Sequence, residues 1–245
     1  MSRCGAPEVA EAEAGGAVAD LFEQVRRALG TTFVPTVYRR LAAHPAALEA
    51  AVAPLGSIVH LAREEDFVDR AQRLAARLFA VDPSVKTVAP PGARSVVERY
   101  RAANPLNLVF AVAVLDVGPT PGSVMAPPLG PSRVDENEDI EACHGGVVLP
   151  GLWRELAPSA RWRSAAWSAL RSEAEAGHLR TARDQVLAAA ADLVSRSPVA
   201  AAHEQVLPLL PPAVAAELRG FPAVIASMVV EAEWLVRAMD NDKEE

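Results

Sequence analysis

The stretch FVPTVYRRLA, at residues 33–42, returns in altered form as VLPGLWRELA, at residues 148–157. Each copy has a proline followed by an aliphatic residue, an aromatic residue and an arginine, and all of these positions align at one common offset. Further on, ERYRAANPLNLVFAVAV (98–114) resembles AELRGFPAVIASMVVEA (216–232) at nearly the same offset. A single match arises easily by chance between alanine-rich helices, but two matches in the same order predict a duplicated helical unit.

Apolar residues spaced by three and four predict helices throughout the chain. The clearest pattern lies between residues 17 and 29, and Gly30 then ends that helix. Residues 106–115 are apolar on nearly every side, which is typical of a buried helix. The other helices are predicted at 36–44, 46–60, 67–79 and 94–104. The predicted fold is therefore all-α, with two tandem pseudo-repeats forming an intramolecular pseudo-dimer and a ligand pocket between them.

Proline and glycine mark a boundary between the two halves. Residues 118–139 contain five prolines and three glycines, a composition that favours turns over helix. The sequence thus predicts a first helical repeat over residues 1–117, a linker over 118–139, and a second helical repeat over 140–245.

Composition limits the compartment and the partners. A formal net charge of -7 argues against nucleic acids and anionic membranes, because both need a basic surface. Cys4 and Cys143 are too few for a disulfide framework, which indicates a reducing compartment. The N-terminus has no apolar signal segment, and the apolar runs are too short to span a bilayer. We expect a cytoplasmic protein whose partner is a small-molecule ligand or substrate, with a homodimer left open.

The same motifs resemble a known enzyme family. GTTFVPTVYRRLAAHPAALEA (30–50) and YRAANPLNL (100–108) are similar to the first repeat of group I 2-haloacid dehalogenases, and VLPGLWRELAPSARWRSAAW (148–167) is similar to the second. The resemblance implies a helical pseudo-dimer with its pocket between the repeats. It also implies a cofactor-free reaction in which an activated water displaces halide from C2 of a small acid. The alkylhydroperoxidase D-like proteins share the opening in which a helix follows Val-Pro.

The resemblance also assigns catalytic positions. The family's general base is an aspartate directly before the aromatic-arginine pair of the second repeat, and that position here is Leu152, with Val37 as its first-repeat counterpart. Neither side chain can accept a proton. Asn104 matches the family's water-orienting asparagine, although an asparagine before proline is also a common helix N-cap, and we predict capping as its main role. Glu155 and Glu98 are candidate replacement bases, with solvated helix surface as the competing role.

The other candidate site residues come from the same motifs. The predicted catalytic residues are Asn104 and Glu155, and the predicted substrate-binding residues are Val37, Tyr38, Asn107, Leu152, Trp153 and Arg154. Arg154 matches Arg39 of the first repeat, and an arginine suits a bidentate grip on a substrate carboxylate. A structural salt bridge is the alternative for both arginines, and we predict it ahead of substrate binding.

No metal or cofactor is indicated by the sequence. Cys143 is followed by His144, but no second cysteine completes a C-x-x-C motif, and the five histidines lack metal-ligand spacing. Three functions stay open: a dehalogenase-like enzyme or repurposed relative acting on a small carboxylic or apolar substrate, a non-catalytic ligand-binding or interaction protein, and a cofactor-free cyclase or isomerase of secondary metabolism.

Overall fold

The computed structural model describes residues 7–79, 89–115, 135–146 and 148–240. These residues form helices and connecting turns with no strand, which confirms the all-α class. The α-helices are α1 Gly16–Leu29, α2 Thr36–Leu41, α3 Pro45–Val52, α4 Leu55–Glu64, α5 Phe67–Leu78, α6 Pro91–Leu115, α7 Glu136–Cys143, α8 Gly151–Glu155, α9 Ala160–Glu175, α10 His178–Ser195, α11 His203–Val206, α12 Pro212–Leu218 and α13 Phe221–Asp240. Short 3-10 turns lie at Glu11–Glu13, Ala157–Ser159, Pro198–Ala201 and Leu207–Leu209.

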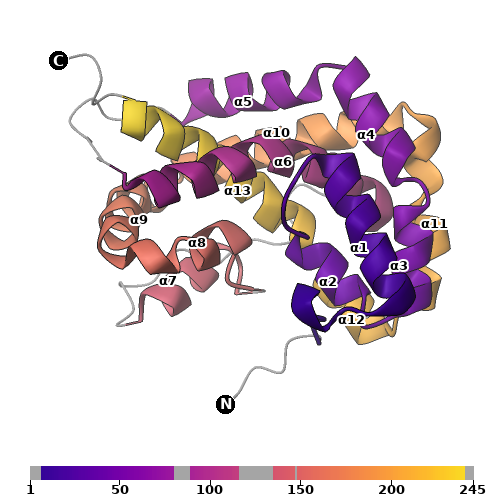
Figure 1. The fold of residues 1–245 in the computed structure, drawn as a ribbon. Coiled ribbons are helices and arrows are strands. Elements are labelled where there is room, and N and C mark those ends of the chain that lie inside the picture. Colours follow the sequence, from indigo (N-terminus) through magenta and orange to yellow (C-terminus); the bar gives the residue numbers. More distant parts are fainter. Residues whose placement is uncertain (1–6, 80–88, 116–134, 147, 241–245) are drawn as a thin grey trace.

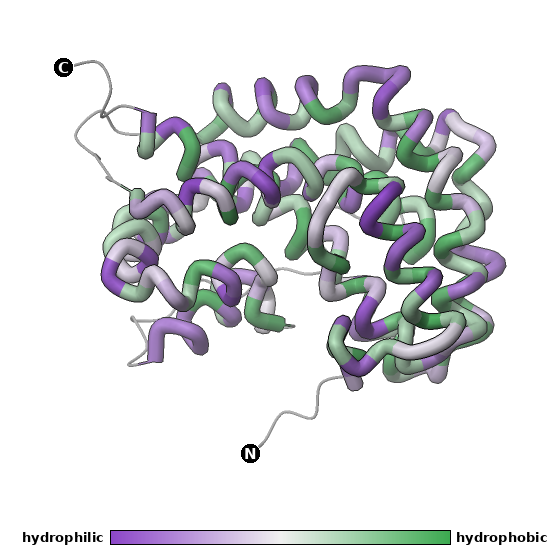
Figure 2. The backbone as a smooth tube through the Cα atoms, in the orientation of Figure 1, coloured by the Kyte–Doolittle hydropathy of each residue, from purple (hydrophilic) through white to green (hydrophobic). Residues whose placement is uncertain are grey.

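Two long helices, α6 and α13, pack along each other at the centre of the fold (Figure 1). The hydropathy colouring shows strongly apolar stretches in both helices and polar residues along the outer helix α5 (Figure 2). The segment 106–115 of α6 is buried throughout, as its all-round apolar pattern predicts. Tyr38 of α2 stacks on Phe110 of α6 with ring centroids 4.4 Å apart, so the short helix α2 is held against this centre.

The prediction of separate helices at 94–104 and 106–115 is wrong, because α6 runs without interruption through Pro105. Proline has no backbone N–H, so the Arg101 carbonyl four residues earlier loses its usual intrahelical donor. The side-chain amide of Gln72, on α5, donates to that carbonyl at 3.2 Å. A tertiary contact therefore supports the proline inside the helix. Asn104 consequently lies within α6, and the N-cap role predicted for it is also wrong.

Two other predicted boundaries differ from the structure. The helix expected over 46–60 is two helices, since α3 ends at Val52 and α4 begins at Leu55, directly after Pro54. The linker expected to extend to residue 139 ends sooner, because α7 already begins at Glu136. The Asp135 carboxylate caps α7 by accepting from the backbone N–H of Asn137 at 2.8 Å. Residues 118–134 of the predicted linker lie outside the described residues.

The short helices α2 and α8 each begin directly after a proline, Pro35 and Pro150. Both prolines are the N-cap residues of these helices, in the extended conformation, where a backbone N–H is not needed by the helix. Helix α2 packs against α3 (Figure 1), and α8 contacts α9 where the ring centroids of Trp153 and Trp167 lie 5.3 Å apart. Their first residues, Thr36 and Gly151, border the same pocket. The internal repeat that pairs these helices stays a prediction.

Two helical stretches, Pro45–Glu64 and Pro212–Asp240, are long and apolar enough to cross a bilayer by composition alone. The most apolar window of the first stretch is 44% buried inside the fold, and that of the second stretch is 67% buried. Both stretches also contain breaks between consecutive helices, after Val52 and after Leu218. Packing in the core accounts for most of the second window and for less than half of the first.

Candidate functional site

A pocket lies where the first turns of α2 and α8 meet the middle of α6 and the start of α13. It encloses about 350 Å³ between side chains, part of it open to solvent, with room at its centre for about one water molecule. The lining residues are Pro35, Thr36, Val37, Tyr100, Asn104, Asn107, Val148, Pro150, Gly151, Phe221, Val224, Ile225 and Met228. Most of this wall is apolar, and Met228 is its most adaptable side chain because it is unbranched and flexible. In this conformation the enclosed space holds a water-sized group, so a ligand of a few carbons requires the wall to open, with its apolar part against the apolar side chains.

Asn104 and Asn107 supply the buried polar groups of the pocket. They are one turn apart on α6, so both side chains lie on the same helix face. Each is only 2% exposed. The Asn104 Nδ2 donor and the Asn107 Oδ1 acceptor have no hydrogen-bond partner within the described residues. Buried amides are normally satisfied, so this unpartnered pair marks a place for a water molecule or for the polar group of a ligand.

Tyr100 brings a hydroxyl to the pocket and links it to Glu155. The phenol donates to Glu155 Oε1 at 2.7 Å, and Glu155 Oε2 accepts from Arg99 at 3.0 Å. The Tyr100 ring stacks on Phe33 with centroids 4.7 Å apart, which fixes its position. Burial, and next the neighbouring Glu155 charge, raise the pKa of Tyr100 above its ordinary value. The phenol therefore stays protonated and acts as a hydrogen-bond donor.

Comparisons with known proteins place the fold. The sequence matches no family model, and no curated protein matches it. A solved complex of a D-2-haloacid dehalogenase mutant with D-2-CPA is similar, with a TM-score of 0.75, 14% identity and 97% of each chain covered. A second D-2-haloacid dehalogenase mutant gives 0.73, 14% and 97% of each chain, and a complex of the enzyme with L-LA gives 0.72, 14% and 98%.

The chain has the all-α fold of the D-2-haloacid dehalogenases. The agreement covers almost the whole length of both chains, and at 14% identity it shows the fold alone. Because one fold hosts many functions, the activity has to be argued from the side chains of the pocket.

The candidate residues drawn from the dehalogenase resemblance lie in three places. Val37, Asn104 and Asn107 line the pocket. Glu155 and Arg154 do not line the pocket but bond to residues that do. Glu155 accepts from Tyr100, and Arg154 Nη2 donates to Thr36 Oγ1 at 2.7 Å. The remaining three, Tyr38, Leu152 and Trp153, are 0% exposed and are not among the lining residues. Leu152, which the sequence resemblance aligns with an aspartate of those enzymes, is thus in the core.

Sequence reasoning missed a buried polar cluster behind α8. His144 Nε2 lies 2.7 Å from Glu231 Oε1, and the Trp153 indole donates to Glu231 Oε2 at 2.9 Å. The other ring nitrogen of His144 lies 2.7 Å from the Ile140 carbonyl, so both nitrogens face acceptors and the ring fits best as an imidazolium. The available signal was Glu231 itself, an acid inside the apolar run FPAVIASMVVEAEWLV at residues 221–236.

The pKa of His144 follows from this cluster. Burial is the largest influence and disfavours the charged ring, but the Glu231 charge, the Glu231 hydrogen bond and the Ile140 carbonyl together outweigh it. The net result is a raised pKa for His144.

Burial, with the nearby Glu231 and Asp139 charges, raises the pKa of the Cys143 thiol to about 12, which leaves this cysteine a poor nucleophile.

Gly151 is required by the hydroxyl of Tyr100. A β-carbon at Gly151 would lie 2.6 Å from the Tyr100 hydroxyl oxygen, and the Phe33 stack prevents the ring from moving away easily. We expect Gly151→Ala to lower the free energy of unfolding by about 1–2 kcal/mol, despite the higher helix propensity of alanine.

In a Tyr100→Phe background the nearest atoms to that β-carbon are ring carbons at 3.3 and 3.4 Å, so the cost should fall by at least half. Urea unfolding of the two single variants and the double variant measures this coupling. Additive effects would contradict the proposed clash.

Proposed function

We propose that the protein binds a small organic molecule in the pocket between α2, α6, α8 and α13. The observation that supports this most directly is the pair of unpartnered amide groups on Asn104 and Asn107, one donor and one acceptor against an apolar wall. Each unsatisfied buried group costs about 1–3 kcal/mol, which a ligand carrying one acceptor and one donor would recover. An amide, a hydroxy compound or a carboxylic compound of a few carbons has these properties.

The proposal does not include hydrolytic dehalogenation. Displacement of halide by water needs a base to take the water proton. Within the part of the chain that the structure describes, no lining residue is an aspartate or glutamate, and Leu152 lies in the core. The pocket therefore supports binding better than this chemistry.

Binding of propionamide tests the proposal, because this neutral probe carries both a donor and an acceptor. We expect Asn104→Leu and Asn107→Leu each to weaken its binding about tenfold, the value of one hydrogen bond. Since both amides lack protein partners, the variants should unfold at the same or a higher urea concentration than the native protein. Calorimetric titration and urea unfolding measure the two effects.

Asn137→Leu is the matched control, because Asn137 accepts from Arg163 on α9 and does not line the pocket; it should bind propionamide as the native protein does. Equal binding by all variants, or no binding by the native protein, would remove the support for this pocket as the ligand site. Halide release from either enantiomer of 2-chloropropionate should stay at the uncatalysed rate.

A second candidate, a cofactor-free enzyme that works by proton transfer, is favoured by the Tyr100–Glu155 hydrogen bond. The Tyr100 hydrogen is already donated to Glu155, so the pair could act as a base: the phenol oxygen would take a proton from the ligand while its own proton passes to the carboxylate. Halide release that disappears in Glu155→Gln would favour this candidate over simple binding.

A further inference from the structure

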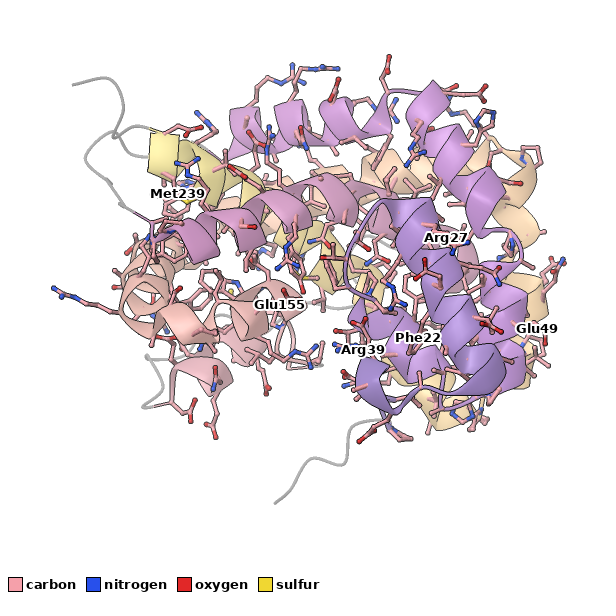
Figure 3. All side chains as sticks on the ribbon, viewed as in Figure 1. Phe22, Arg27, Arg39, Glu49, Glu155 and Met239 are labelled. Atoms are coloured by element: carbon pink, nitrogen blue, oxygen red, sulfur yellow. The ribbon has the colours of Figure 1, made fainter. Side chains whose placement is uncertain are left out.

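Arg39 and Arg154 converge on one hydroxyl at the edge of the pocket. Thr36 Oγ1 accepts from Arg39 Nη2 at 3.1 Å and from Arg154 Nη2 at 2.7 Å, and Thr36 itself lines the pocket. The positive charges of both arginines also partly offset the raised pKa of Tyr100, which lines the same pocket. We call Arg39, Arg154 and Thr36 the arginine subsite. Figure 3 labels Arg39 of α2, a member of this subsite, and Glu155 of α8.

Two guanidinium groups that share one oxygen atom repel each other, so they need an anion nearby. The anion in this structure is Glu8, whose Oε1 lies 2.9 Å from Arg39 Nη2 and 3.5 Å from Arg154 Nη1. One carboxylate against two guanidinium groups leaves an excess positive charge. The Arg39 Nε is buried without a hydrogen-bond partner, so the subsite also retains an unused donor. A second anion or a better placed one would be bound favourably.

Glu8 belongs to a segment that is anchored by other residues. Val9 N–H donates to the Arg39 carbonyl at 3.0 Å. Glu11 accepts from the Val34 backbone at 2.8 Å and pairs with Arg26 at 3.0 Å. The Glu8 side chain can therefore leave the arginines while the backbone stays in place, because the segment does not depend on it.

The Thr36 hydroxyl connects the arginine subsite to the pocket interior. Its oxygen already accepts from two arginines, which uses its lone pairs and leaves its hydrogen free to donate. A carboxylate at the pocket edge would thus meet two guanidinium groups and a hydroxyl donor. Arginine is well suited to this ligand because its planar donors match the two carboxylate oxygens.

We propose that the arginine subsite binds the carboxylate of a short carboxylic acid, and that Glu8 occupies the subsite in the free protein as an intramolecular competitor. This proposal rests on the proposed function and narrows its ligand class. The acid would place its carboxylate at Arg39 and Arg154 and its apolar part in the pocket. Neutral ligands would reach the pocket without competing with Glu8.

Propionate and its neutral isostere propionamide test the proposal by calorimetric titration. If Glu8 occupies the subsite about nine-tenths of the time, Glu8→Gln should tighten propionate binding about tenfold and leave propionamide unchanged. Glu13→Gln is the matched control, because Glu13 is exposed in the same segment and the charge change is the same. Adding Arg154→Gln to Glu8→Gln should abolish the gain, whereas adding Arg196→Gln on the exposed end of α10 should not.

The outcomes separate this proposal from the proposed function. Propionamide binding without any effect of Glu8→Gln on propionate would overturn the arginine subsite and leave the pocket as a neutral ligand site. Propionate binding by Glu8→Gln without propionamide binding would support the subsite and count against Asn104 and Asn107. No binding of either probe by any variant would overturn both. An equal gain in Glu13→Gln would also overturn the subsite, because the effect would then come from overall charge.

Discussion

Replacing Glu231 by leucine is expected to lower the free energy of unfolding by about 3–5 kcal/mol, one of the two largest effects predicted for this protein. The Glu231 and His144 side chains are both 0% exposed, and the carboxylate also accepts from the Trp153 indole. Without it, the imidazole and the indole are both left buried without their acceptor. Urea unfolding monitored by circular dichroism measures the loss.

The exposed pair His60 and Glu64 provides the control, because it contains the same two residue types at 3.1 Å on the surface of α4. Solvent screens such a pair, so Glu64→Leu should change the unfolding free energy little. Equal effects of the two substitutions would show that the buried cluster adds nothing beyond a surface ion pair.

The same cluster predicts how stability changes with pH. His144 has a raised pKa in the folded protein, so the folded state holds its proton more tightly than the unfolded state does. The resulting stabilisation is complete below the ordinary value of 6.5 and is lost as pH rises through the folded pKa. This loss above pH 6.5 should be absent in Glu231→Leu, and an unchanged slope in that variant would contradict the assignment to His144.

Leu152→Asp is expected to destabilise the protein by about 4 kcal/mol without creating a dehalogenase. Leu152 is fully buried and does not line the pocket, so an aspartate there would lose packing and place a carboxyl group in an apolar region. We expect no halide release from 2-chloropropionate by this variant. A stable Leu152→Asp protein that releases halide would show that this position does reach the ligand.

The pH dependence of Leu152→Asp separates charge from packing. Burial should raise the pKa of the new carboxyl group above the usual value of about 3.9, so the folded state would bind the proton more tightly. The destabilisation should therefore be smaller at pH 4.5 than at pH 8. Leu152→Asn, which has the same size and no charge, should show no such difference.

The position of Asn104 depends on a tertiary contact as well as on its local sequence. The dehalogenase resemblance alone singled out Asn104 as a site residue, since its local sequence favours a helix cap; it lines the pocket, and its catalytic role stays a prediction. Its actual place inside α6 depends on Gln72, a residue of another helix that supports the Arg101 carbonyl. No local pattern contains that contact.

The sequence by itself determined the all-α class, the helix over residues 17–29, which begins one residue earlier in the structure, and the buried character of residues 106–115, because helix periodicity and apolar content are local properties. Only the tertiary structure decided that Leu152 is in the core, that Glu155 acts on the pocket through Tyr100, and that Glu8 lies between Arg39 and Arg154. Each of these facts depends on how separate helices pack. Glu8 and Arg154, for example, are 146 positions apart, so no local sequence pattern relates them.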